Sequence, residues 1–134
     1  MEKYKYISVP SDKWRKFVDI AFNNSKYFSL TLFFGVAPKY DYIINELDYW
    51  LIDVEIVWGE YEKRFYECNS FTKRIIFSIK NIDMFGKGKY PDDLCFYSEA
   101  GMWFENISHE SDSYIILPEC NVMDKLKENC FIIF

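Results

Sequence analysis

The feature of this sequence that most restricts its fold is a series of short segments in which every second side chain is apolar. One such segment spans residues 27–35, with apolar side chains at Phe28, Leu30, Leu32 and Phe34. A period of two places these side chains on one face of a β-strand. The same alternation predicts a strand over residues 49–58. Segments bounded by turn residues predict further strands over residues 61–68, 73–80, 94–98, 102–107, 111–117 and 131–134. Gly-, Asn- and Ser-containing turns between successive segments favour antiparallel hairpins.

Two predicted helices flank these strands. Residues 11–24 carry apolar side chains at the spacing of one helical face, namely Trp14, Phe17, Val18 and Ala21. Residues 118–129 predict a short C-terminal helix, and residues 38–48 fit either a helix or an irregular approach to the next strand. This order indicates an α+β fold with an N-terminal helix, a mostly antiparallel meandering sheet and a short C-terminal helix. No linker or repeat interrupts the chain, so we expect residues 1–134 to form one globular domain.

Composition narrows the class of protein. Of 134 residues, 50% are hydrophobic and 21% aromatic, which excludes a disordered or low-complexity chain. The formal net charge of −5 argues against nucleic acid and against an acidic membrane surface as partners. The N-terminus lacks the apolar core of a signal peptide, and no apolar run approaches the length of a membrane span. We therefore expect a cytoplasmic protein.

The cysteines fit that compartment. They are scattered along the chain without a C-x-x-C pair, at Cys68, Cys95, Cys120 and Cys130. In a chain without an export signal, this pattern is typical of reduced, mostly buried thiols. One histidine and four scattered cysteines do not make the usual pattern of a metal site, so we expect neither a metal nor another cofactor.

His109 is the one candidate for acid–base catalysis. It is the only histidine of the chain, and histidine is the commonest general acid–base group. It lies beside Glu110 at a predicted turn, where a solvent-facing histidine needs no catalytic role. We assign no catalytic residue. A small enzyme that uses His109 with a carboxylate or a cysteine is one alternative, and a carrier that binds an apolar ligand in an aromatic cup is another.

Charge is distributed along the chain in blocks. Residues 41–62 and residues 90–119 each contain seven acidic residues and no Lys or Arg, whereas residues 1–40 and 63–89 carry net charges of +4 and +5. If the two acidic blocks meet in the fold, they form an acidic, aromatic-rich surface suited to a basic protein. If acidic strands instead pair with basic strands, the charges neutralise each other within the sheet.

The first acidic block supplies the candidate binding residues. We expect its charge to come from Asp53, Glu55, Glu60 and Glu62. We expect its hydrophobic anchors to be Trp50, Trp58 and Tyr61, because Trp and Tyr are prominent at protein interfaces. Asp53 and Glu55 are two positions apart on a predicted strand and project from one face. Such a pair could serve a glycosidase, although a solvated sheet face explains it more simply.

A resemblance adds to this interpretation. Residues 92–104 read DDLCFYSEAGMWF and are followed by Ile107, Ser108, His109 and Glu110. In these residues and in its small size, acidity and aromatic content, the chain resembles the small acidic immunity proteins that bacteria encode beside polymorphic or contact-delivered toxins. The resemblance implies a non-enzymatic protein that neutralises a cognate toxin by tight binding. The leading hypothesis is thus an immunity protein whose acidic, aromatic face blocks a basic toxin.

Overall fold

The computed structural model describes residues 4–33, 41–87, 90–116 and 121–134. Its α-helices are α1 (Trp14–Asn23), α2 (Asp41–Leu47), α3 (Ser70–Ser78) and α4 (Asn121–Glu128). Its strands are β1 (Lys5–Tyr6), β2 (Tyr27–Phe33), β3 (Leu51–Val57), β4 (Tyr61–Glu67), β5 (Asp92–Ser98), β6 (Gly101–Ile107) and β7 (Asp112–Ile115). Short 3-10 turns include η1 (Ser11–Lys13), η3 (Asp48–Trp50), η4 (Ile82–Met84) and η5 (Ser108–Glu110).

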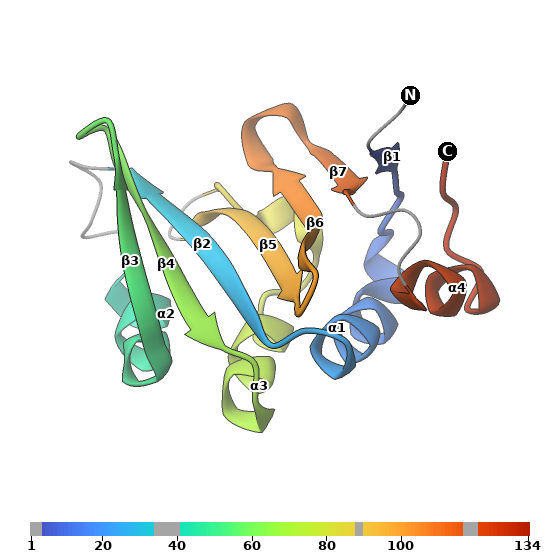
Figure 1. Ribbon diagram of the computed structural model, residues 1–134, viewed down its shortest axis with the longest axis horizontal. Coiled ribbons are helices and arrows are strands. Elements are labelled where there is room, and N and C mark those ends of the chain that lie inside the picture. The colour runs from blue at the N-terminus through green and yellow to red at the C-terminus, as the bar shows by residue number, and fades with distance from the viewer. Residues whose placement is uncertain (1–3, 34–40, 88–89, 117–120) are drawn as a thin grey trace.

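The strands form one sheet in the order β1-β7-β6-β5-β2-β4-β3. Every pairing between neighbours in this order is antiparallel. Figure 1 shows the helices gathered on one side of the curved sheet, with β3 at one edge and β1 at the other. The architecture confirms the predicted α+β class, with a helix near the N-terminus, an antiparallel sheet and a short C-terminal helix. No helix among the described residues is long and apolar enough to cross a membrane.

The two faces of the sheet carry different side chains. On the face toward the helices, Phe28 of β2 lies opposite Tyr66 of β4 and Phe96 of β5, and its ring contacts both. Phe17 of α1 packs on Phe96 with ring centroids 6.2 Å apart. Phe17, Phe28, Tyr66 and Phe96 are fully buried. Each such side chain contributes roughly 1.5–3 kcal/mol through burial, so this aromatic layer is the core that fixes the sheet against α1.

On the face without helices, aromatic side chains of the sheet itself cover the central strands. Tyr27, Phe65 and Tyr97 contact one another across β2, β4 and β5, with centroids 4.8–6.1 Å apart. Beneath them Ser29 is fully buried, and its hydroxyl lies 2.9 Å from the Tyr97 hydroxyl. We call this side the open face. The alternation predicted for residues 27–35 is confirmed over β2, while residues 34 and 35 lie outside the described residues.

The predicted strand over residues 73–80 is wrong, because the structure has helix α3 there. The Asn69 carboxamide oxygen accepts the backbone N–H groups of Phe71 and Thr72, and the Thr72 hydroxyl oxygen accepts the N–H of Asn69. This capping box satisfies amides that the first helical turn would otherwise leave unpaired. Thr72, Ile76 and Ile79 are buried at helical spacing. The alternation of Ile75 and Phe77 suggested a strand, but capping and this buried row decide for the helix.

The structure also decides three other predicted segments. Of the two possibilities for residues 38–48, the structure has a helix, α2, which buries Ile43, Ile44 and Leu47. The predicted last strand over residues 131–134 is reduced to one antiparallel bridge between Ile133 and Ile7. The predicted C-terminal helix is present as α4, and residues 118–120 of that prediction lie outside the described residues.

Candidate functional site

The β3–β4 hairpin displays a tryptophan in an unfavourable backbone conformation. The turn is closed by the Glu60 N–H, which donates to the Val57 carbonyl at 3.0 Å. Both central residues have positive φ, 56° for Trp58 and 70° for Gly59. Glycine adopts this region freely, but an L side chain there costs about 1–2 kcal/mol. Trp58 is also 92% exposed, so burial in the free protein does not offset that cost.

Strand β3 leaves apolar side chains in solvent. Leu51, Val54 and Ile56 lie opposite Tyr66, Arg64 and Glu62, and therefore point to the helix side of the sheet. The helices do not cover them, since 37% of Leu51, 37% of Val54 and 58% of Ile56 is exposed. These three residues are not among the binding residues predicted from the sequence. A period-two pattern shows which side chains share a face, but it does not show that the face belongs to an uncovered edge strand.

Three of the four predicted acidic residues are exposed on this hairpin. Asp53 and Glu55 project from the open face of β3, and Glu60 lies at the turn. Glu62 projects from the other face, where its carboxylate binds the Arg64 guanidinium at 3.0 Å, and only 17% of its side chain is exposed. Glu62 therefore belongs to an internal ion pair, whereas Asp53, Glu55 and Glu60 form an acidic rim beside Trp58.

The other two predicted aromatic anchors are less accessible. Trp50 is half-buried in η3, where its ring stacks on Phe71 of α3 with centroids 5.5 Å apart. Tyr61 is half-buried on the open face, where its ring contacts Phe33 at 5.4 Å. The structure thus brings Trp58 together with the acidic rim, while Trp50 helps to hold the base of β3 against α3.

Charge pairing within the sheet removes part of the first acidic block. Asp48 accepts hydrogen bonds from both the Arg64 guanidinium and the Tyr66 hydroxyl. Lys63 lies directly opposite Glu55. The strands of the second acidic block, β5, β6 and β7, are separated from β3 by β2 and β4, and residues 117–119 of that block lie outside the described residues. The strands of the two blocks are therefore not neighbours in the sheet. Of the first block, Asp53, Glu55 and Glu60 are exposed on the hairpin, and Glu46 is exposed on α2.

A titratable cluster lies near the middle of the open face. Burial opposes the charged form of Lys63, but the electrostatic effects of Cys95, Tyr97, Glu105 and Glu55, in that order of size, outweigh this effect and raise the pKa of Lys63. Burial also raises the pKa of the Cys95 thiol to about 12 and that of the half-buried Cys68 thiol to about 12. Such thiols stay protonated and unreactive at neutral pH. Cys68, Cys95 and Cys130 are free, and Cys120 lies outside the described residues.

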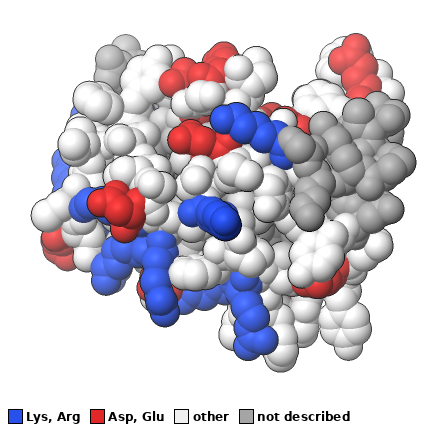
Figure 2. Space-filling model, turned by 180° about the vertical axis from the view of Figure 1, so that it is seen from behind, with Lys and Arg blue, Asp and Glu red and all other residues white. Residues whose placement is uncertain are grey.

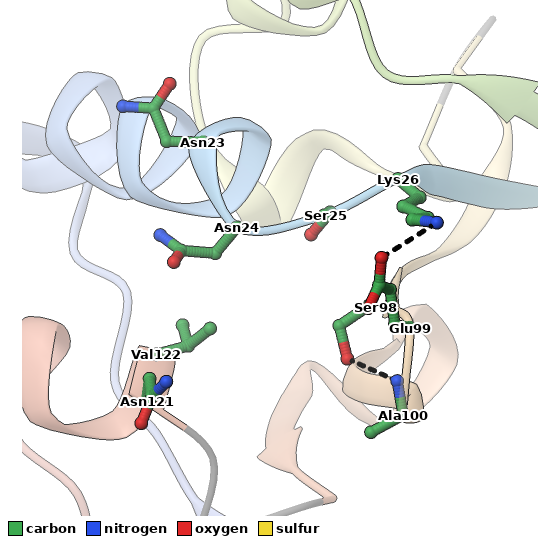
Figure 3. Close-up of a pocket in the computed structure, with 9 residues that line it drawn as sticks. All are labelled: Asn23, Asn24, Ser25, Lys26, Ser98, Glu99, Ala100, Asn121 and Val122. Atoms are coloured by element: carbon green, nitrogen blue, oxygen red, sulfur yellow. Dashed lines mark hydrogen bonds and ion pairs between the residues drawn. The ribbon is translucent and has the colours of Figure 1, made fainter.

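A polar cleft of about 520 Å³ opens between the end of α1, the β5–β6 turn and the start of α4 (Figure 3). Its walls carry amide and hydroxyl groups from Asn23, Asn24, Ser25, Ser98 and Asn121. An ion pair between Lys26 and Glu99, 3.0 Å apart, lies at one side. This cleft is polar and wide open, so it differs from the enclosed apolar cup that the carrier alternative requires.

His109 is exposed on η5 and does not line this cleft. Within the described residues, no group of three or more His, Cys, Asp or Glu side chains could hold a metal ion.

Helices α1 and α3 carry several basic side chains. Figure 2, which views the molecule from behind, shows Lys and Arg side chains along the lower part of that view, with some Asp and Glu among them. On α1 and α3, the Lys73 ammonium binds Asp19 at 2.6 Å and the Arg15 guanidinium lies 5.2 Å from the centre of the Phe77 ring.

Comparison with known proteins adds no relative. No protein-family model, no curated protein and no solved structure matches this chain.

Proposed function

We propose that this chain is a non-enzymatic protein-binding domain that captures a basic protein through the β3–β4 hairpin. One observation carries the proposal: Trp58 is held 92% exposed in a left-handed conformation at the tip of the hairpin. Residues kept in a costly conformation tend to mark functional sites. Tryptophan is also among the residues most enriched in the energetically dominant part of protein interfaces.

The surroundings of Trp58 indicate the chemistry of the partner. The exposed strand β3 offers apolar surface on its helix side, from Val54 and Ile56, and acidic side chains on its open face, from Asp53 and Glu55. Glu60 adds a further carboxylate at the turn. Protein interfaces commonly combine apolar contacts with charged groups at their margin. The acidic rim would steer a basic partner toward the hairpin and disfavour acidic ones. Together with the resemblance described above, this supports a role as a bacterial immunity protein that blocks a basic toxin in the cytoplasm.

The test begins with the neighbouring reading frame. An immunity protein should be encoded beside a large secreted protein, whose C-terminal domain would be the toxin. Binding of that purified domain to this chain should be measured as separate association and dissociation rates. Association should slow as salt rises, because the screening length falls from about 10 Å at 0.1 M to roughly 3 Å at 1 M, while dissociation should change less.

Charge reversal then locates the acidic surface. The double variant Asp53→Lys, Glu55→Lys should slow association about tenfold or more at low salt. A matched control, Asp124→Lys with Glu128→Lys, makes the same change in net charge on exposed positions of α4, and it should have a much smaller effect. If both double variants behave alike, or if association ignores salt, the acidic-hairpin mechanism is wrong.

A further inference from the structure

The outer edge of β3 carries backbone groups that β4 does not use. β3 is the last strand of the sheet, and among the described strands it pairs with β4 alone. The Val54 N–H donates to the carboxylate of Asp53 at 2.8 Å instead of to β4. Because alternate residues of an antiparallel strand direct their N–H and C=O groups to the same side, Ile56 shares this outward orientation. The edge therefore offers a ladder of hydrogen-bonding groups to an added strand.

Edge strands are usually protected against pairing with other chains, and β3 has only part of this protection. Natural proteins keep edge strands short, charged or covered, because a long apolar edge pairs with other chains. β3 has seven residues, and none of them is buried. An added strand would cover the apolar side chains of Leu51, Val54 and Ile56 and would satisfy the outward backbone groups. Asp53, through its bond to the Val54 N–H, is the main obstacle to such pairing.

The acidic residues of β3 exclude a second copy of this chain as the added strand. An antiparallel pair of β3 strands centred on Val54 would place Asp53 of each copy opposite Glu55 of the other. Registers centred on Asp53 or on Glu55 would place the two copies of that residue opposite each other. Like charges directly opposite each other destabilise a strand pair, and these are the registers that pair the middle of the strand.

We infer that the outer edge of β3 accepts an extended basic segment of the partner as an additional strand of the sheet. Its Lys or Arg side chains would lie on the open face, opposite Asp53 and Glu55, and its apolar side chains would lie beside Val54 and Ile56. A cation opposite Asp53 draws the carboxylate toward itself and releases the Val54 N–H for the ladder. Strand addition of this kind takes affinity from main-chain hydrogen bonds and specificity from alternate side chains. This inference rests on the proposed capture of a basic protein and adds how that protein is held.

The test uses a synthetic peptide of seven residues, the length of β3, in which Lys and Val alternate. Three probes are compared with the full chain at low salt: this peptide, the same peptide methylated on the backbone nitrogens of alternate residues, and a peptide with Glu in place of Lys. We expect the first peptide to bind and to slow amide hydrogen exchange at Val54 and Ile56 at least tenfold. The methylated peptide, with the same charge, should bind at least tenfold more weakly, and the Glu peptide should not bind.

A variant of the protein provides the reciprocal measurement. Val54→Pro removes the outward N–H without removing a bond to β4, and proline is tolerated at edge positions of this kind. It should lower the affinity for the Lys-Val peptide at least tenfold, whereas Val54→Thr, which keeps the N–H, should lower this affinity less. The methylated peptide keeps the inference testable if Val54→Pro does not fold.

The two proposals fail in different ways. If the methylated and unmodified peptides bind equally, or if Val54 and Ile56 exchange as before, strand addition is wrong while charge-based capture stands. If the Lys and Glu peptides bind alike, capture of a basic partner is wrong as well. Absence of binding by the Lys-Val peptide overturns strand addition at this edge.

Discussion

Two buried tryptophans differ in one hydrogen bond. Trp103 is fully buried, and its indole N–H donates to the Ser25 hydroxyl at 2.8 Å. Trp14 is 3% exposed, and its indole N–H finds no acceptor among the described residues. An unpaired buried donor costs about 1–3 kcal/mol, so the chain tolerates this cost for the sake of the packing of the Trp14 ring against Phe17 and Phe85.

Replacing each tryptophan by phenylalanine should expose this difference. Both Trp14→Phe and Trp103→Phe remove the same ring volume, but only Trp103→Phe breaks a hydrogen bond, and only Trp14→Phe removes an unpaired donor. We expect Trp103→Phe to lower the free energy of unfolding by about 1–3 kcal/mol more than Trp14→Phe does. Urea unfolding of both variants measures this, and equal losses would mean that the Trp14 N–H is satisfied in solution.

At the scale of elements, we expect the residue at position 58 of the β3–β4 turn to affect the stability of the fold and the binding of a partner in opposite directions. Trp58→Asn creates an Asn-Gly pair, the sequence that best suits two successive residues of positive φ. We expect it to raise the free energy of unfolding by about 1 kcal/mol, because asparagine tolerates the left-handed region. We also expect faster dissociation of the proposed basic partner, because the exposed ring is lost.

The control for this substitution is Trp58→Phe, which keeps an aromatic ring and the unfavourable φ. Its stability should stay within about 0.5 kcal/mol of the original. A stable Trp58→Asn variant that binds as well as the original chain would remove Trp58 from the interface. A destabilised Trp58→Asn variant would show that Trp58 makes packing contacts in solution.

The elements also show how far sequence patterns extend. Alternation located β2 and β3, because apolar side chains recur at every second position in each, and the turn residues Gly59 and Glu60 located the start of β4. It failed at α3, where a capping box begun by Asn69 matters more than two alternating apolar residues. Capping residues are present in the sequence, so the helix could have been found from Asn69 and Thr72.

The candidate site could be predicted only in part. The sequence singled out Trp58, Asp53, Glu55 and Glu60, which the structure places together on one exposed hairpin. It could not separate them from Glu62, because the face on which each strand residue projects depends on the register of the hairpin. Nor could it identify β3 as an edge, because strand order is set by packing between segments far apart in the chain.

For the molecule as a whole, the buried thiols predict a loss of stability in alkali. The pKa of Cys95 is about 12 in the folded chain against an ordinary value of 9.0, and burial is the main cause. Above pH 9 the unfolded chain therefore loses this proton before the folded chain does, which favours unfolding. Stability should be fully present below pH 9 and should fall progressively as the pH rises toward 12, by on the order of 4 kcal/mol for a group shifted this far.

Urea midpoints measured at intervals between pH 7 and pH 12 test this prediction. The variant Cys95→Ala lacks the titrating group, so its stability should fall less steeply above pH 9, whatever its level at pH 7. Burial also raises the pKa of Tyr66 and of Tyr97, so some alkaline loss should remain in the variant. Parallel curves for the two proteins would show that Cys95 ionises in the folded chain near its ordinary pKa.

The pairing of the two chain ends determines how the molecule responds to a pulling force. The Phe134 N–H donates to the Tyr6 carbonyl and the Ser8 N–H to the Ile132 carbonyl, at 2.9 and 3.0 Å, around the antiparallel bridge between Ile7 and Ile133. Because the two end segments are antiparallel, both ends leave this pairing on the same side. A force that pulls the ends apart therefore breaks these hydrogen bonds one after another instead of loading them all at once. The β3–β4 hairpin lies at the opposite edge of the sheet (Figure 1). Under traction the ends should therefore separate at low force, before the strain reaches the hairpin.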